Sequence, residues 1–193
     1  MAQDKITHPA GLLVIGGSAG SLEVILQVLP AISTTLNFAI LIVVHRKPTS
    51  DTLLVDLLST KINMPVKEAE EKEFIYPNRV YVAPADYHLL IEKDNSFSLD
   101  VSEKVNYSRP GIDVTFESAA DVYGKSLVAL LLSGANADGV AGLKKVKEKG
   151  GLCIVQDPSS AEVDYMPRQA IQELQVDKIL TPSEMAGYIN QLR

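Results

Sequence analysis

Residues 12–20 read LLVIGGSAG, in which an apolar run stops at a glycine pair and Ser18 follows between Gly16 and Gly20. The run predicts a buried strand, and residues 21–29 predict a helix directly after it. A Gly-x-Ser-x-Gly sequence between a strand and a helix is typical of a sharp turn that lifts the serine hydroxyl clear of the backbone. Ser18 is therefore a candidate nucleophile, although the same helix N-terminus would also favour a bound phosphate.

Three further apolar runs resemble the first. They are FAILIVVH, SLVALLLSG and GLCIVQD, and helical spacing follows in residues 51–60 and 139–149. Strands that are apolar on both faces indicate a parallel sheet covered by helices. We therefore predict a three-layer, doubly wound α/β fold with a mostly parallel sheet, whose binding crevice lies beyond the carboxyl ends of the strands.

The middle of the chain has a different pattern. Residues 79–83, 87–93 and 97–102 alternate more between apolar and polar side chains, and Asn95-Ser96 stands where a tight turn would join two of these segments. This pattern predicts an antiparallel hairpin inserted into the parallel fold.

Composition limits the class of protein. The 193 residues, 46% hydrophobic and 22% charged, suit one domain over residues 1–193 with about the first ten as a tail. The net charge of −6 and the mixing of Lys with Glu leave no basic stripe for nucleic acid. The chain has no signal region and no apolar run approaching the ~20 residues that cross a bilayer, which predicts a cytoplasmic protein without membrane insertion. Cys153 lies in an apolar run and is interpreted as a core residue.

A partner base and acid can be sought at the other strand ends. His45 closes the second apolar run and is placed to face the crevice, and histidine can accept and return a proton near neutral pH. Asp138 follows the third run near a predicted helix start. It could cap that helix or hold the imidazole of His45 in one tautomer. Asp157 and Asp113 compete for the second role, but each has a local explanation as a turn or cap residue.

The order Ser, His, Asp along the chain differs from that of the α/β-hydrolases and of the two large serine-protease classes. Six ordered segments resemble the catalytic domain of the CheB-type chemotaxis methylesterases, which hydrolyse glutamyl γ-methyl esters on bacterial chemoreceptors. The segments are VIGGSAGSLE, VVHR, RVYVAPADYHLLI, SRPGIDVTFESAA, LLLSGANADGVAGL and IVQDPSSAEVDYMPRQA. The resemblance implies that Ser18 is the nucleophile, His45 the general base and acid, and Asp138 the carboxylate that orients His45.

The chain departs from the family's pattern at three places. Ala19 stands where a threonine is common, Gly134-Ala135-Asn136 where Gly-Met-Gly is common, and Tyr165 where a glycine often precedes Met-Pro. Many members also carry an N-terminal receiver domain, and here about ten residues precede the first predicted strand. The resemblance thus implies a stand-alone esterase, with control by a separate receiver or methyltransferase as one option.

The resemblance further implies an enzyme that needs no metal or organic cofactor and that could also deamidate receptor glutamines. Its substrate would be a helix of a methylated chemoreceptor or other sensor protein, in a shallow cleft with Arg46, Arg109 and Arg168 as candidate cations. Three alternatives stay open at this point. They are a phosphate-binding module, a hydrolase of small esters or amides, and a non-catalytic family member that docks on a sensor protein.

Overall fold

The computed structural model describes residues 11–46 and 51–192. Seven parallel strands form one sheet in the order β3-β4-β2-β1-β7-β8-β9. The four predicted runs are β1 (Leu12–Gly17), β2 (Ala39–Val44), β7 (Leu127–Leu131) and β8 (Leu152–Gln156). The short strands β3 (Val66–Glu68), β4 (Val80–Val82) and β9 (Lys178–Leu180) extend the sheet. The predicted three-layer α/β fold is confirmed.

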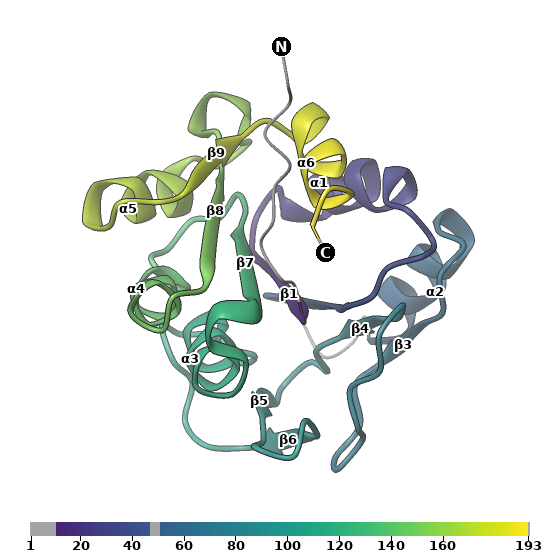
Figure 1. Cartoon of the computed structure of the whole chain (residues 1–193). Coiled ribbons are helices and arrows are strands. Elements are labelled where there is room, and N and C mark those ends of the chain that lie inside the picture. Colours follow the sequence, from purple (N-terminus) through teal and green to yellow (C-terminus); the bar gives the residue numbers. More distant parts are fainter. Residues whose placement is uncertain (1–10, 47–50, 193) are drawn as a thin grey trace.

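Helices cover both faces of the sheet because side chains of the buried strands alternate between two apolar cores (Figure 1). One core lies against α1 (Ser21–Val28), α2 (Asp51–Lys61) and α6 (Pro182–Ile189). The other lies against α3 (Ile112–Tyr123), α4 (Val140–Glu148) and α5 (Tyr165–Glu173). In the described part of the chain there are also 3₁₀ turns at η1 (Leu29–Ala31), η3 (Gly124–Ser126) and η4 (Pro158–Ser160).

The predicted antiparallel hairpin is present, but it is smaller than expected. It consists of β5 (His88–Ile91) and β6 (Phe97–Asp100), with Asn95 at φ 63° in its turn. Residues 79–83 were wrongly grouped with it, because β4 pairs in parallel with β2 and β3. The prediction counted Tyr81 as a polar, outward-facing position of an alternating strand. Its ring is instead fully buried, and its hydroxyl accepts a hydrogen bond from the backbone N–H of Tyr76 at 3.1 Å.

The glycine pair at the end of β1 allows two helices to approach the strand. A Cβ atom on Gly16 would lie 2.5 Å from Ile112 Cγ2 at the start of α3, and one on Gly17 would lie 2.5 Å from Ser21 Cβ at the start of α1. Gly20 takes a left-handed conformation (φ 78°) at the N-cap of α1. Small residues are therefore required where the strand, the serine turn and both helices meet.

The strand order places a crevice at the end of β1. From β1 the sheet grows through β2 and β4 on one side and through β7, β8 and β9 on the other. Loops at the carboxyl ends of β1 and its neighbours diverge at such a switch point, where α/β proteins bind ligands. Ser18, His45 and the loop that carries Asp138 follow β1, β2 and β7, so all three lie at this edge of the sheet.

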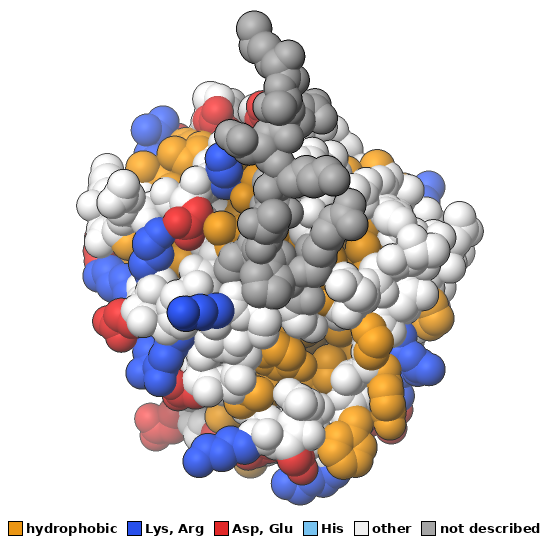
Figure 2. Space-filling model, in the orientation of Figure 1, with side chains coloured by type: hydrophobic (Ala, Val, Ile, Leu, Met, Phe, Trp, Pro, Cys, Tyr) orange, Lys and Arg blue, Asp and Glu red, His pale blue; other side chains and the backbone are white. Residues whose placement is uncertain are grey.

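The surface carries mixed charge. Lysines in and directly after α4 pair with carboxylates of neighbouring segments, including Lys144 with Glu173 and Lys149 with Asp121. On the face drawn in Figure 2, basic and acidic side chains are interspersed and form no continuous basic stripe. No helix in the described part of the chain is long and apolar enough to cross a membrane.

Candidate active site

Ser18 is fixed from both sides by the strands next to β1. Its N–H donates to the Ser133 carbonyl at 2.9 Å, and the N–H of His45 donates to the Gly17 carbonyl at 3.3 Å. The parallel register aligns Gly17 with Val44, so the next residues on the two strands, Ser18 and His45, emerge side by side. Their side chains meet, with 3.1 Å between Ser18 Oγ and His45 Nδ1.

His45 also contacts the predicted acid. Its Nε2 lies 2.8 Å from Asp138 Oδ2, and the side chain of Asp138 is fully buried. When Nδ1 accepts the proton of Ser18, Nε2–H donates to Asp138 and holds the ring. The two ring nitrogens thus have the opposite partners from those of the chymotrypsin arrangement, in which Nε2 faces the serine. The structure brings Ser18, His45 and Asp138 together in one hydrogen-bonded chain.

Asp138 does not cap its own helix, contrary to one of the two sequence interpretations. Its carboxylate accepts hydrogen bonds from the backbone N–H groups of Ile112 (2.7 Å) and Asp113 (3.0 Å), at the start of α3. Asp113 in turn accepts from the N–H groups of Gly139 (2.9 Å) and Gly142 (2.7 Å), at the start of α4. Each helix therefore takes its cap from the other, and this exchange fixes the acid opposite His45.

Asn106 completes this pair of carboxylates and was not identified from the sequence. Its side-chain amide donates to Asp113 Oδ2 at 3.0 Å and to Asp138 Oδ1 at 3.3 Å. One neutral side chain thus donates to both carboxylates, which also lie close to each other. The sequence offers one weak signal for this turn, which is the residue type of Asn106. Asparagine tolerates the left-handed backbone conformation that Asn106 has here (φ 49°).

The two buried carboxylates respond in opposite directions. Burial alone would raise the pKa of Asp138, but hydrogen bonds from His45 and from the N–H groups of Asp113 and Ile112 outweigh it and hold the pKa below its ordinary value. For Asp113, burial and then the nearby charge of Asp138 outweigh its two backbone hydrogen bonds and raise its pKa to about 6. Asp138 is thus the carboxylate that stays ionised beside His45.

Ser133 connects the loops around Ser18 and was not identified from the sequence. Its buried hydroxyl donates to the Ala19 carbonyl at 2.7 Å and accepts from the N–H of Val163 at 2.9 Å. The side chain of Gln156 at the end of β8 accepts from the Ser133 N–H at 2.9 Å. The serine turn is therefore connected to the loops after β7 and β8.

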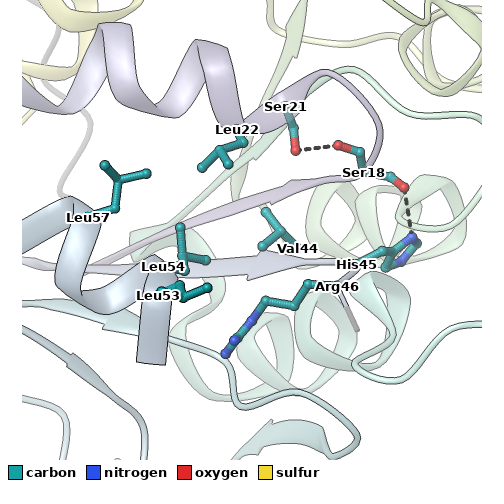
Figure 3. Close-up of a pocket in the computed structure, with 9 residues that line it drawn as sticks. All are labelled: Ser18, Ser21, Leu22, Val44, His45, Arg46, Leu53, Leu54 and Leu57. Atoms are coloured by element: carbon teal, nitrogen blue, oxygen red, sulfur yellow. Dashed lines mark hydrogen bonds between the residues drawn. The ribbon is translucent and has the colours of Figure 1, made fainter. Parts of the chain in front are cut away.

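Two open cavities flank His45 and share Arg46. The first, about 200 Å³, extends from Ser18 over an apolar wall formed by Val44, Leu22 of α1 and Leu53, Leu54 and Leu57 of α2 (Figure 3). The second, about 340 Å³, is lined by Lys104, Tyr107 and Arg109 among others. Arg46 and Arg109 thus lie at the cleft as predicted. Arg168 pairs with Asp164 instead and lines neither cavity.

The competing candidates have other roles. His88 is buried, with its ring between the Glu103 carbonyl and the Gly111 N–H, and Asp157 accepts from the N–H of Ser159 in a turn. Cys153 is fully buried, and burial raises the pKa of its thiol to about 12, so it is not a nucleophile near neutral pH. His8 lies outside the described residues. Within residues 11–46 and 51–192, no three His, Cys, Asp or Glu side chains cluster as metal ligands would.

Comparison with known proteins agrees with this geometry. The family model for the CheB methylesterases matches residues 13–189. The chain belongs to this family.

Several members are similar over nearly all of this chain. A putative protein-glutamate methylesterase/protein-glutamine glutaminase of Leptospira interrogans is 49% identical, and the match covers 90% of each chain. A protein-glutamate methylesterase/protein-glutamine glutaminase of Thermotoga maritima is 35% identical over 91% of this chain but only 53% of its own length. The CheB methylesterase catalytic domain of Thermotoga maritima superposes with a TM-score of 0.91 at 32% identity, covering 94% of this chain and 98% of that one.

The unusual pKa of Asp113 gives a test of the carboxylate pair. A carboxyl group whose pKa is higher in the folded state than in the unfolded state stabilises the fold at low pH and loses that contribution as the pH rises. As the pH rises from 3.8, the ordinary pKa of an aspartate, to about 6, the unfolding free energy of wild type should fall by up to about 3 kcal/mol relative to that of Asp113→Asn. Urea unfolding of both proteins at pH 4, 5, 6 and 7 measures the difference, and parallel pH profiles would contradict it.

Proposed function

We propose that this chain is a serine hydrolase that removes methyl groups from glutamyl γ-methyl esters of chemoreceptor proteins. The observation that carries the proposal is the hydrogen-bonded chain from Ser18 through His45 to Asp138, at the ends of three adjacent strands. Membership of the CheB methylesterase family supports it. Relatives whose names state this activity are similar over about nine-tenths of this chain.

The first half of the proposed reaction is acyl transfer to Ser18. His45 Nδ1 takes the hydroxyl proton while Oγ attacks the side-chain carbonyl of the esterified glutamate. The imidazolium that forms is stabilised by the ionised carboxylate of Asp138, 2.8 Å from Nε2. The C–O bond to the methoxy group then breaks, and the methoxy oxygen leaves as methanol with the proton from His45.

The backbone of the serine turn can stabilise the negative oxygen of the intermediate. In α/β-hydrolases, the N–H of the residue after the nucleophile serves this purpose. Here that residue is Ala19, and neither its N–H nor that of Gly20 donates to any described residue. Because these donors belong to the backbone, the family's usual threonine side chain at this position is not needed for them.

The second half regenerates the enzyme. His45 removes a proton from water, the hydroxide attacks the acyl-enzyme, and Ser18 Oγ leaves with that proton, so the product is a free glutamate. A glutamine side chain would follow the same path with ammonia as the leaving group. We therefore propose protein-glutamine deamidation as a second reaction of the same site, in agreement with the names of the relatives.

The shape of the site fits a polypeptide substrate. The side chain of His45 is 12% exposed, and both cavities beside it are open to solvent. The apolar wall of Leu22, Leu53 and Leu57 can pack against an apolar side chain next to the reacting glutamate. A helix of a methylated chemoreceptor or similar sensor protein is the proposed substrate, and a cytoplasmic location is proposed with it.

Methanol release from a methylated chemoreceptor fragment tests the function. Wild type should release methanol at near-neutral pH in proportion to enzyme concentration, and receptor incubated without enzyme gives the background rate. Binding of the fragment without methanol release would favour the non-catalytic docking alternative. Hydrolysis of generic esters without action on the fragment would favour a hydrolase of small substrates.

A further inference from the structure

A two-residue turn contributes Tyr107 to the lining of the second cavity. The backbone N–H and carbonyl groups of Val105 and Ser108 exchange two hydrogen bonds, of 3.1 and 2.9 Å. The residues between them, Asn106 and Tyr107, both have left-handed backbones, with φ of 49° and 64°. Hairpin turns of this kind favour Asn-Gly, and tyrosine is strained at the second position. The side chain of Tyr107 is nevertheless 96% exposed, so no packing in the fold repays that strain.

The turn is attached firmly to the active site. Asn106 donates to Asp113 and Asp138, and its carbonyl accepts from the side chain of Asn136 at 3.4 Å. The carboxylate that orients His45 therefore also holds the residue next to Tyr107. Tyr107 and His45 line the same cavity, which places an exposed aromatic ring beside the reacting group.

The cavity between them carries positive charge. Its charged lining residues are Arg46, Lys104 and Arg109 against the single carboxylate of Asp86. Arg46 pairs with Glu68 and Arg109 pairs with Asp86. No carboxylate among the described residues pairs with the ammonium of Lys104, which is exposed. Because Arg46 and Arg109 each face a carboxylate, the ammonium of Lys104 supplies the net positive charge here, and in a chain of net charge −6 it favours an anionic ligand at this position.

We propose that Tyr107 and Lys104 determine substrate specificity by binding an acidic residue of the substrate, close to the esterified glutamate. The ring of Tyr107 packs on the methylene groups of that residue, and Lys104 pairs with its carboxylate. On a helical substrate, residues three or four positions apart lie on one face about 5–6 Å apart, so a second glutamate at that spacing would reach the cavity while the ester lies at Ser18. This inference rests on the proposed function and adds the sequence context that the enzyme selects.

Two substitutions separate this role from a structural one. Tyr107→Gly removes the ring and relieves the backbone strain, so the midpoint of urea unfolding should stay or rise. For a methylated receptor fragment, KM should rise about tenfold with kcat within about twofold, since an exposed contact of this size acts mainly on binding. Hydrolysis of p-nitrophenyl acetate, which has no second carboxylate, should not change.

Lys104→Gln removes the charge alone. It should raise KM for the receptor fragment about threefold at low salt and reduce the salt dependence of KM, because an exposed ion pair is weak and screened. With a fragment in which the neighbouring glutamates are replaced by alanine, wild type and Lys104→Gln should have equal KM values.

Tyr76→Ala is the control for the tyrosine substitution, because Tyr76 is a half-exposed tyrosine that precedes β4 and lines neither cavity.

The outcomes distinguish the two proposals. If wild type demethylates the fragment and Tyr107→Gly has an unchanged KM, the specificity role is wrong while the proposed function stands. An equal loss on p-nitrophenyl acetate would also overturn the specificity role, since it would show a general effect on the site. If wild type releases no methanol from the fragment, the proposed function fails, and this inference fails with it.

Discussion

Ser18→Ala should lower kcat for methyl-ester hydrolysis by at least about 10⁴-fold, because the covalent route through the acyl-enzyme is lost and only binding and the backbone N–H groups remain. The fold should not change. The Ser18 hydroxyl contacts His45, whereas the turn is held by backbone hydrogen bonds and by Ser133. Methanol release from a methylated receptor fragment measures the activity, and urea unfolding measures stability.

A serine-directed fluorophosphonate probe gives an independent readout of the nucleophile. It should label wild type at Ser18, as located by peptide mass analysis, and should leave Ser18→Ala unlabelled. Ser59→Ala, at an exposed position of α2, is the matched control and should keep both labelling and activity. Retention of more than about a hundredth of the wild-type kcat by Ser18→Ala would exclude Ser18 as the nucleophile.

Asp138→Ala should have a double effect. Loss of the carboxylate leaves His45 without its orienting partner, which costs about 10⁴-fold in kcat in the serine proteases for which it has been measured. The same substitution leaves the N–H groups of Ile112 and Asp113 without an acceptor in a buried place, so unfolding free energy should fall by about 2–4 kcal/mol. Ser18→Ala should also lose activity, but its unfolding free energy should stay close to that of wild type.

Two further variants interpret that result. Asp138→Asn keeps the shape of the side chain, but only one of its two terminal atoms can accept hydrogen bonds, whereas donors contact both oxygens of the carboxylate. This variant should therefore lose as much activity as Asp138→Ala while losing less unfolding free energy. Asp157→Ala alters an aspartate that also follows a strand but contacts only its own turn, and its activity should match wild type. Full activity of Asp138→Asn would show that the carboxylate is not the group that orients His45.

Local sequence was sufficient for the elements that are long and buried. The runs that became β1, β2, β7 and β8 are apolar on both faces and rich in β-branched residues, a pattern typical of central parallel strands. The glycines around Ser18 and the turn at Asn95 also follow from local backbone requirements. The position of His45 after β2 could therefore be predicted from chain order alone.

Short edge elements could not be predicted in the same way. Strand β9 has three residues, of which two are exposed, and β4 contains a tyrosine, whose hydroxyl makes the segment look partly polar in the sequence. Such segments become strands because a neighbouring strand offers hydrogen-bond partners, and that neighbour is distant in sequence. The cap interpretations of Asp113 and Asp138 were wrong for the same reason, because each carboxylate caps the helix that begins next to the other.

The chain's pattern of strands and helices, its Gly-x-Ser-x-Gly turn and its family membership are all properties of local sequence and of segment order. The resemblance to the family also indicated Asp138 as the partner of His45, but the contacts that hold Asp138 there, the orientation of the imidazole and the cationic cavity that Tyr107 lines do not follow from the sequence. They depend on contacts between residues far apart in the chain, as between His45 and Asp138, which are separated by 93 positions. Burial and charge at those contacts exist only once the sheet has brought the strand ends together.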